Sequence, residues 1–230
     1  MEQLKFGEHW VTNLGPLQVH MDTLITSWLA IALVIIASLL ITRNLNRIPT
    51  KLQTSAEMVM EFIEGIAGDQ IGKEGYKHVP IIGSLFLFIL TANLVGQLPW
   101  RLYHLEQGEL ASPTNDLNLT VALALIVSVY YFGAGIAKKG LGYFKHYLQP
   151  MWFMAPFNLL EDFTRPFSLA IRLFANILAG EIIILVLIGL LPLFLPIPIM
   201  LFELFVAFIQ AFIFAVLAAS YIAVAVSEEH

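Results

Sequence analysis

Five long apolar stretches restrict what this chain can fold into. They occupy residues 23–42, 79–99, 117–137, 158–191 and 198–226. A helix of about twenty apolar residues is about 30 Å long and spans the hydrocarbon core of a bilayer. No hydrophilic segment between the stretches is long enough to fold alone. The sequence therefore predicts an all-α polytopic membrane protein, with residues 1–230 forming a single membrane domain of five transmembrane helices.

The composition agrees with a membrane protein and excludes several functional classes. Apolar residues make up 58% of the chain and charged residues only 13%, whereas soluble proteins carry roughly 25% charged residues. The absence of cysteine excludes disulfides, thiolate metal sites and thiol nucleophiles. There is no GxxxxGK phosphate loop, and no two histidines stand four residues apart. We therefore expect no metal and no cofactor, and neither nucleotide nor nucleic acid as a ligand of this chain.

The last two apolar stretches are separated by three prolines, Pro192, Pro196 and Pro198. Proline disrupts a helix interior, so prolines gathered in one place favour a turn. We predict a hairpin of two long helices, 158–191 and 198–226. The second helix exceeds the thickness of a bilayer, so it is expected to tilt strongly or to protrude.

Residues 51–70 follow a different pattern. Apolar side chains recur at spacings of three and four, and they are Leu52, Ala56, Val59, Ile63 and Ile66. A separate face carries Glu57, Glu61 and Glu64. This pattern predicts an amphipathic helix. The helix lies either along the membrane interface or against a partner subunit, and the sequence leaves both arrangements open.

The basic residues predict the orientation in the membrane. Most of them lie in the first and third connections between spans, namely Arg43, Arg47, Lys51, Lys73, Lys77, Lys138, Lys139 and Lys145. The opposite side has only Lys5 and Arg101. Connections rich in Lys and Arg stay in the cytoplasm. We therefore expect the N-terminus outside and the C-terminus in the cytoplasm.

Arg172 stands alone inside the fourth apolar stretch, and Glu181 follows it nine residues later. An arginine stays protonated at any ordinary pH, and placing it near the bilayer centre costs at least ~2.5–3.5 kcal/mol. Such residues normally line an ion or substrate path, although an arginine paired with a carboxylate for structural reasons is the alternative. At 100° per residue, Arg172 shares a narrow stripe with polar or small residues, namely Arg165, Ser168, Asn176 and Ala179. Glu181 lies half a turn away from the stripe and roughly 13 Å further along, so the two charges are not expected to pair.

The last apolar stretch contains Glu203 and Gln210, which are seven residues apart and so share one face. In an antiparallel hairpin, Gln210 is level with Arg172, and Glu203 with Glu181, to within about one helical turn. Two carboxylates in a low-dielectric site cannot both ionise cheaply, so Glu181 and Glu203 are expected to share a proton or a cation. This arrangement suits a relay that carries a proton or a cation inwards from the water outside. The alternative is that Glu203, close to Pro198, is an ordinary group at the membrane interface.

Three blocks of the sequence resemble subunit a of the rotary F-type ATP synthases, the membrane stator beside the c-ring. The first block contains Ser168, Arg172-Leu173-Phe174, Asn176, Gly180 and Glu181. The second runs from Gln210-Ala211-Phe212-Ile213-Phe214 through Tyr221 and ends in Ser227-Glu228-Glu229-His230. The third is Pro113-Thr114-Asn115-Asp116-Leu117-Asn118, followed by Lys138-Lys139-Gly140-Leu141-Gly142. Together they cover most of residues 80–230 and match in order and spacing, whereas the first eighty residues match only in general plan.

The resemblance implies a non-catalytic subunit that moves ions. In the family, the arginine matching Arg172 faces an essential carboxylate on each c-subunit and separates two half-channels for H⁺ or Na⁺. The path is lined by residues that match Ser168, Asn176, Glu181, Glu203 and Gln210, and Asp116 resembles an acidic residue of the outer funnel. The implied partners are the c-ring of small two-helix subunits, the peripheral-stalk b subunits and the lipid bilayer.

Two positions depart from the family's pattern. Glu203 replaces a histidine of some members, so the pair here is carboxylate with carboxylate. Gly96 stands where some members have an aspartate, so the outer route is expected to rely on Asp116, Glu181 and Glu203. A cluster at the start of the fourth stretch, Glu161, Asp162 and Arg165, is expected to form a local ion pair, with the mouth of an inner half-channel as the alternative.

Two other functional classes compete with this interpretation. A stand-alone proton-coupled secondary transporter would need a substrate cavity, usually with broken helices near the midplane, whereas the prolines here lie at a connection. In a purely structural membrane subunit, the free-energy cost of placing Arg172 and Glu181 in the membrane would have no explanation. The bacterial plasma membrane is the expected location, with the thylakoid membrane as the alternative.

Overall fold

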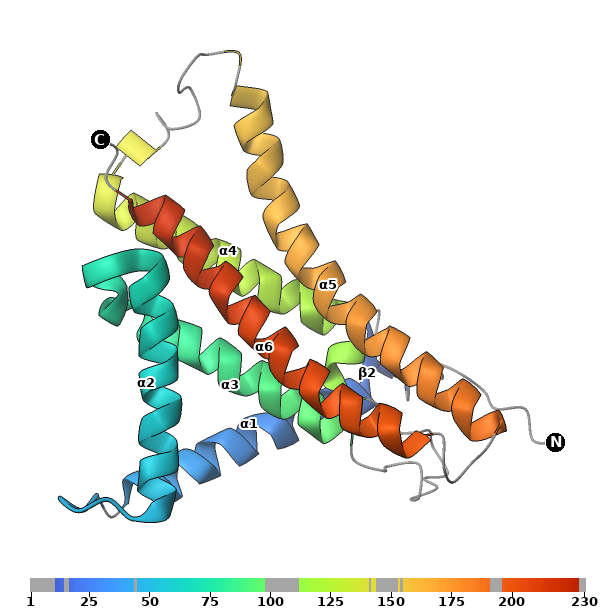
Figure 1. Ribbon diagram of the computed structural model, residues 1–230. Helices are drawn as coiled ribbons and strands as arrows, with labels where there is room; N and C mark the ends of the chain where they lie inside the picture. The colour runs from blue at the N-terminus through green and yellow to red at the C-terminus, as the bar shows by residue number, and fades with distance from the viewer. Residues whose placement is uncertain are drawn as a thin grey trace.

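The computed structural model describes residues 11–14, 17–43, 45–97, 112–140, 142–143, 153, 155–190 and 196–227. The elements begin with a β-hairpin, β1 (Val11–Leu14) and β2 (Leu17–His20). The α-helices are α1 (Met21–Thr42), α2 (Lys51–Ile71), α3 (Val79–Gly96), α4 (Leu117–Lys139), α5 (Ala155–Leu190) and α6 (Pro196–Val226). Two short 3-10 helices, η1 (Gly72–Lys77) and η3 (Pro113–Asn115), precede α3 and α4 (Figure 1).

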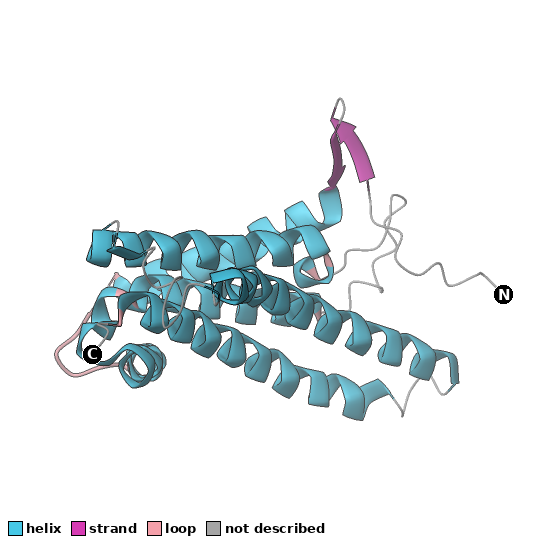
Figure 2. Ribbon diagram, turned by 90° about the horizontal axis from the view of Figure 1, so that it is seen from above, coloured by secondary structure: helices cyan, strands magenta, loops and turns pink. Residues whose placement is uncertain are grey.

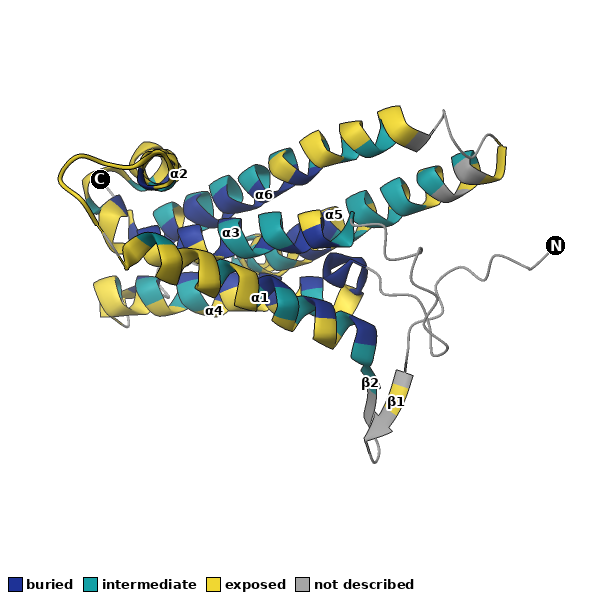
Figure 3. Cartoon of the chain, turned by 90° about the horizontal axis from the view of Figure 1, so that it is seen from below, coloured by how far each residue is buried: buried dark blue, intermediate teal, exposed yellow. Residues whose placement is uncertain are grey.

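Within the described residues, five helices are long and apolar enough to cross a membrane: α1, α3, α4, α5 and α6. They run roughly along one direction, while α2 lies across their ends and is seen end-on in Figure 3. The predicted architecture, five spans with one additional amphipathic helix, is therefore confirmed.

The observed helix ends lie within three residues of the predicted ends wherever the structure describes them. The start of α6 lies two residues before the predicted start, because the helix begins at Pro196 rather than at residue 198. The backbone N–H groups of the first helical turn have no acceptor within the helix. Proline lacks this N–H, so the first turn accommodates both Pro196 and Pro198. Residues 98–99 and 191, which belong to two of the predicted spans, lie outside the described residues.

The β-hairpin is an element that the sequence pattern did not predict. Its two strands are antiparallel, with Val11 opposite His20 and Leu14 opposite Leu17. Figure 2 shows the hairpin projecting from one end of the helix bundle. Because β2 runs directly into α1, the hairpin holds His20 at the start of the first span.

The core lies between α3, α4 and α6, with fewer contributions from α2 and α5. On α6 the buried side chains are mostly small, among them Ala207, Ala211, Ala215, Ala218 and Ala219. Small residues let helix backbones approach closely inside a membrane. On α5, by contrast, most residues are exposed or half-buried (Figure 3). One long face of α5 is therefore not covered by the described part of this chain.

The amphipathic helix α2 buries only the second half of its predicted apolar face. Ile63 and Ile66 are buried against the bundle, whereas Leu52 is 74% exposed and Val59 is 38% exposed. The face with Glu57, Glu61 and Glu64 is exposed along its whole length. The exposed apolar half fits both of the arrangements that the sequence left open.

The two ends of the bundle differ in charge. The end where α2 lies receives the α1–α2 connection and the last turn of α4, and so carries Arg43, Arg47, Lys51, Lys138 and Lys139. We call it the basic end. The opposite end carries the β-hairpin and η3, and we call it the β-hairpin end. The described acidic residues there are Asp22, Asp116, Glu181 and Glu203, whereas the basic end also carries acids, among them those on the exposed face of α2.

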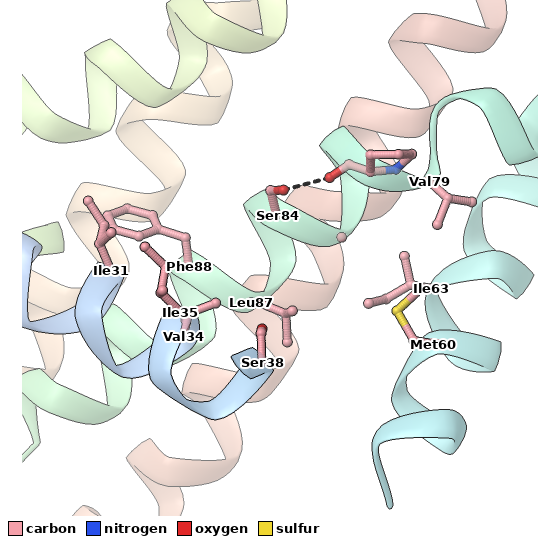
Figure 4. Close-up of a pocket in the computed structure, with 12 residues that line it drawn as sticks. Ile31, Val34, Ile35, Ser38, Met60, Ile63, Val79, Ser84, Leu87 and Phe88 are labelled. Atoms are coloured by element: carbon pink, nitrogen blue, oxygen red, sulfur yellow. Dashed lines mark hydrogen bonds between the residues drawn. The ribbon is translucent and has the colours of Figure 1, made fainter. Parts of the chain in front are cut away.

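A cavity of about 530 Å³ lies between α1, α2 and α3 (Figure 4). Its lining is aliphatic and aromatic, with Ser38 and Ser84 as the polar exceptions. The hydroxyl of Ser84 donates to the backbone oxygen of Pro80 at 2.6 Å, so it is already satisfied within the helix. This cavity has no charged lining residue that could stabilise an ion, and the candidate site lies elsewhere.

Candidate functional site

Asp116 caps the start of α4 and connects the β-hairpin to the bundle. Its Oδ1 accepts the backbone N–H of Asn118 at 2.8 Å, the usual role of an aspartate that precedes a helix. Its Oδ2 lies 2.8 Å from Nδ1 of His20, and Asp116 is 5% exposed against 27% for His20. Burial raises the pKa of the Asp116 carboxyl, but hydrogen bonds from Asn118, His20 and Thr23 outweigh burial and lower the pKa below its usual value. An ionised carboxylate therefore lies just behind a partly exposed histidine.

Asn115, the neighbour of Asp116, connects η3 to α5. Its Nδ2 donates to Oε2 of Glu181 at 2.6 Å, across 66 residues of sequence. Asn115 is 9% exposed, so this hydrogen bond is largely shielded from solvent. Asp116 and the residue before it thus bring two of the predicted site residues, Asp116 and Glu181, to the same end of the bundle.

The remaining residues of the turn pack on α3. Oγ1 of Thr114 donates to Oδ1 of Asn93 at 2.8 Å and lies 2.8 Å from the hydroxyl of Ser112. Nδ2 of Asn93 reaches the backbone oxygen of Ala207 in α6 at 3.5 Å. Gly96 permits this approach, because a Cβ built there would overlap the side chain of Ser112 and lie 2.8 Å from its Cα. The glycine therefore permits close packing of Ser112 on α3.

Glu203 lies against the backbone of α5. A Cβ added to Gly180 would overlap Oε1 of Glu203 and lie 2.9 Å from its Cδ. The carboxylate thus occupies space that a glycine leaves open. Because Gly180 directly precedes Glu181, Glu203 contacts α5 at the height that the hairpin register predicts.

Arg172 lies on the exposed face of α5. Among the described residues it has no ion-pair partner, and Glu181 is bonded to Asn115 instead. Ser168, one turn before it, and Ala179, two turns after it, are also exposed. The predicted stripe is therefore an open face of small and polar groups around a permanent cation.

Two amide groups, one on α5 and one on α6, have hydrogen-bond donors without acceptors in the described part of the chain. They are Nδ2 of Asn176 and Nε2 of Gln210, and Gln210 is only 5% exposed. A buried donor left unsatisfied costs roughly 1–3 kcal/mol. Gln210 makes no hydrogen bond to Arg172, so their proximity stays a prediction.

Arg165, the other arginine of the stripe, is neutralised locally. Its guanidinium contacts Oε1 of Glu161 at 2.6 Å and Oδ1 of Asp162 at 3.0 Å. It also lies over the ring of Tyr221 on α6, 5.4 Å from the ring centroid. The predicted ion pair is present, and the uncharged surroundings of Arg172 distinguish it from Arg165.

Several residues of the site were not found by sequence reasoning, namely His20, Asn93, Thr114 and Asn115. The last two belong to the block that resembled a family, so their polarity just before a span was an available signal. His20 gave no signal, because its partner lies 96 residues away. Within the described residues, no group of three His, Cys, Asp or Glu could hold a metal ion.

The helices and the polar groups at their ends define a class before any comparison is made. The chain is a multi-pass membrane protein, with a permanent cation on one open helix face and carboxylates gathered at one end.

Comparison with known proteins makes the class specific. The family model of the ATP synthase A chain matches residues 24–223. ATP synthase subunit a, chloroplastic, from Oedogonium cardiacum is 50% identical over 232 residues, which cover 100% of this chain and 92% of the relative. The chain belongs to the ATP synthase subunit a family.

Membership in this family establishes the general role of the chain and its main partners. The chain is a membrane subunit of a rotary ATP synthase and contributes to ion transport and ATP synthesis. It is a component of the complex rather than its catalytic subunit, and the c-ring and other subunits of the complex are its partners.

Proposed function

We propose that this chain forms two half-channels that are separated by Arg172 and carry H⁺ or Na⁺ to and from the carboxylates of the c-ring. The observation that carries the proposal is the exposed position of Arg172, with no acid beside it among the described residues. A permanent cation in the membrane is retained where it serves an ion path. On this face, a passing rotor carboxylate supplies the missing negative charge.

The arginine controls ion exchange through its charge. It favours the ionised form of the rotor carboxylate that passes it, because an opposite charge nearby stabilises the charged form. It also repels free cations that would leak directly from one half-channel to the other. Ser168 and Ala179 keep the surrounding surface small, so that the rotor can approach closely. Ion flow is then coupled to rotation.

The outer half-channel is assigned to the β-hairpin end. Asp116, Asn115 and Glu181 are linked through η3, and Glu203 contacts α5 beside Glu181. Further along, the unsatisfied amides of Asn176 and Gln210 offer donors to water in the path or to the rotor.

The inner half-channel is assigned to the basic end. About two turns before Arg172 on α5, the guanidinium of Arg165 lies over the ring of Tyr221 on α6, 5.4 Å from the ring centroid. The ion pairs of Arg165 with Glu161 and Asp162 follow towards the end of α5. This polar series leads from the open face to the basic end.

The relative's chloroplastic origin favours a thylakoid membrane over a bacterial plasma membrane. The basic end is placed on the side where ATP is made, which puts the N-terminus on the opposite side. The b subunits of the peripheral stalk are proposed as further partners. Family membership argues against a stand-alone transporter.

The test replaces Arg172 with alanine in the assembled complex. Arg172→Ala should abolish ATP synthesis driven by an ion gradient while the complex still assembles, because the exposed arginine supports no ion pair within the described chain. Arg47→Ala is the matched control, since Arg47 is an exposed arginine at the basic end, and it should keep wild-type activity. Coupled synthesis at the wild-type rate in Arg172→Ala would exclude the proposed role.

A further inference from the structure

The contact between His20 and Asp116 is not required for the roles of Arg172, Glu181 and Glu203. The imidazole belongs to the β-hairpin, is 27% exposed, and lies 2.8 Å from a carboxylate that is 5% exposed. A hydrophobic or neutral polar residue would suffice to pack a hairpin on the bundle. A histidine instead has two ring nitrogens that can each bind or release a proton, so the ring can take up a proton on one side and release one on the other.

We propose that His20 is a proton-transfer residue at the mouth of the outer half-channel, where it takes protons from water and delivers them to Asp116. This inference rests on the proposed function and deepens it, because it adds a residue and identifies the ion as H⁺. An imidazole binds a proton well, whereas hard cations prefer oxygen ligands.

The transfer step balances with the groups that are present. A proton from water adds to Nε2 of His20, and the proton on Nδ1 passes to Oδ2 of Asp116. The imidazole is then neutral in its other tautomer, and rotation of the ring exchanges the two nitrogens. One proton has moved from water to the carboxyl group, with no change in oxidation state.

The surroundings of the pair keep an ionised proton acceptor beside the imidazole. Because the pKa of the Asp116 carboxyl is lowered, this group holds a proton only briefly, and a proton that it takes from His20 is passed on or returned. Asn115, its neighbour in η3, bonds to Glu181, which is the next carboxylate along the path. Another acidic residue of the described chain, Asp22, follows two residues later and is 1% exposed. Thr23 contributes a hydroxyl to Asp116.

The experiment measures proton flux through the assembled complex in vesicles while the pH on the side of the β-hairpin is varied. His20→Gln removes the imidazole and keeps a hydrogen-bonding side chain, so flux should fall by roughly tenfold or more. Added imidazole buffer should restore much of that flux. His78→Gln is the matched control, because His78 bonds to Tyr130 at the basic end, and its flux should follow the wild-type pH profile.

Asp116→Asn provides a second variant that preserves the start of α4, since asparagine caps helices as well as aspartate does. It should lose flux in the same way, but imidazole should not restore it because the proton acceptor is missing. Wild-type flux in His20→Gln, or a loss that imidazole does not repair, would overturn the inference. So would a wild-type flux that requires sodium. If these results occurred while Arg172→Ala still abolished coupled synthesis, the proposed function would stand and only the role of His20 would fall.

Discussion

Two arginines seven residues apart on α5 show how local sequence sets the state of a charge. Arg165 has acids three and four residues before it, and both form ion pairs with it. Arg172 has Ser168 and Leu169 at the same offsets, which cannot neutralise it. This difference could be predicted from the sequence because both partners of Arg165 are near neighbours on one helix. The polar contacts of Glu181 and Asp116 could not, since they depend on how the helices are packed.

Gly180 is the residue whose replacement tests the position of Glu203. Gly180→Ala places a methyl group where Oε1 of Glu203 lies. The displaced group is the end of a flexible side chain, so the complex should assemble, but the carboxylate should leave its place beside α5. We expect proton flux through the reconstituted complex to fall several-fold.

Gly189→Ala is the matched control for this change. Gly189 lies on the same helix, and a Cβ there would meet nothing within 4 Å. Alanine is favoured over glycine inside a helix by about 0.5–1 kcal/mol, so this variant should have unchanged flux and equal or slightly higher stability. Equal flux in both variants would show that the position of Glu203 beside Gly180 does not matter for transport.

At the scale of elements, the spans were predictable and the short connecting elements were not. Hydropathy determines α1, α3, α4, α5 and α6 because each must cover about 30 Å of lipid. The β-hairpin and η3 have only a few residues each, and the side-chain hydrogen bonds that attach them to the bundle are made to distant parts of the chain. The turn residue Thr114, for example, bonds to Asn93 on the preceding span, a contact that no periodic pattern reveals.

Gly96 tests whether η3 is held by close packing on α3. In Gly96→Ala, the new Cβ would overlap the side chain of Ser112 and would lie only 2.8 Å from the Cα of Ser112. Because a backbone atom is involved, the turn itself must move, and such overpacking costs about 1–3 kcal/mol. The dissociation temperature of the detergent-solubilised complex should therefore fall.

The control for this variant is Gly133→Ala on α4. Gly133 is exposed, and a Cβ there would meet nothing within 4 Å. Its dissociation temperature should equal or exceed that of the wild type. A Gly96→Ala complex as stable as this control would mean that the turn adjusts freely and that the close contact has no role in positioning Asn115 and Asp116.

At the scale of the whole molecule, an odd number of spans separates the described ends of the chain. The β-hairpin lies at one end of the bundle, and Ser227 follows α6 at the basic end. The sorting of basic residues to one end was read from the sequence, because charge bias acts on connections that need no tertiary structure. The side of the membrane that each end faces is a prediction of that rule and has a direct test.

The chain contains no cysteine, so single cysteines can be introduced without background labelling. Thr12→Cys on β1 and Ser227→Cys after α6 both replace exposed residues. In sealed membranes, an impermeant maleimide on the side where ATP is made should label Ser227→Cys and leave Thr12→Cys unlabelled. Lys51→Cys, at the exposed start of α2, should follow Ser227→Cys because both lie at the basic end. Labelling of Thr12→Cys from that side would reverse the orientation and move the mouth of the outer half-channel, with His20 and Asp116, to the ATP-making side. Labelling of Thr12→Cys and Ser227→Cys from the same side would contradict the five-span fold itself.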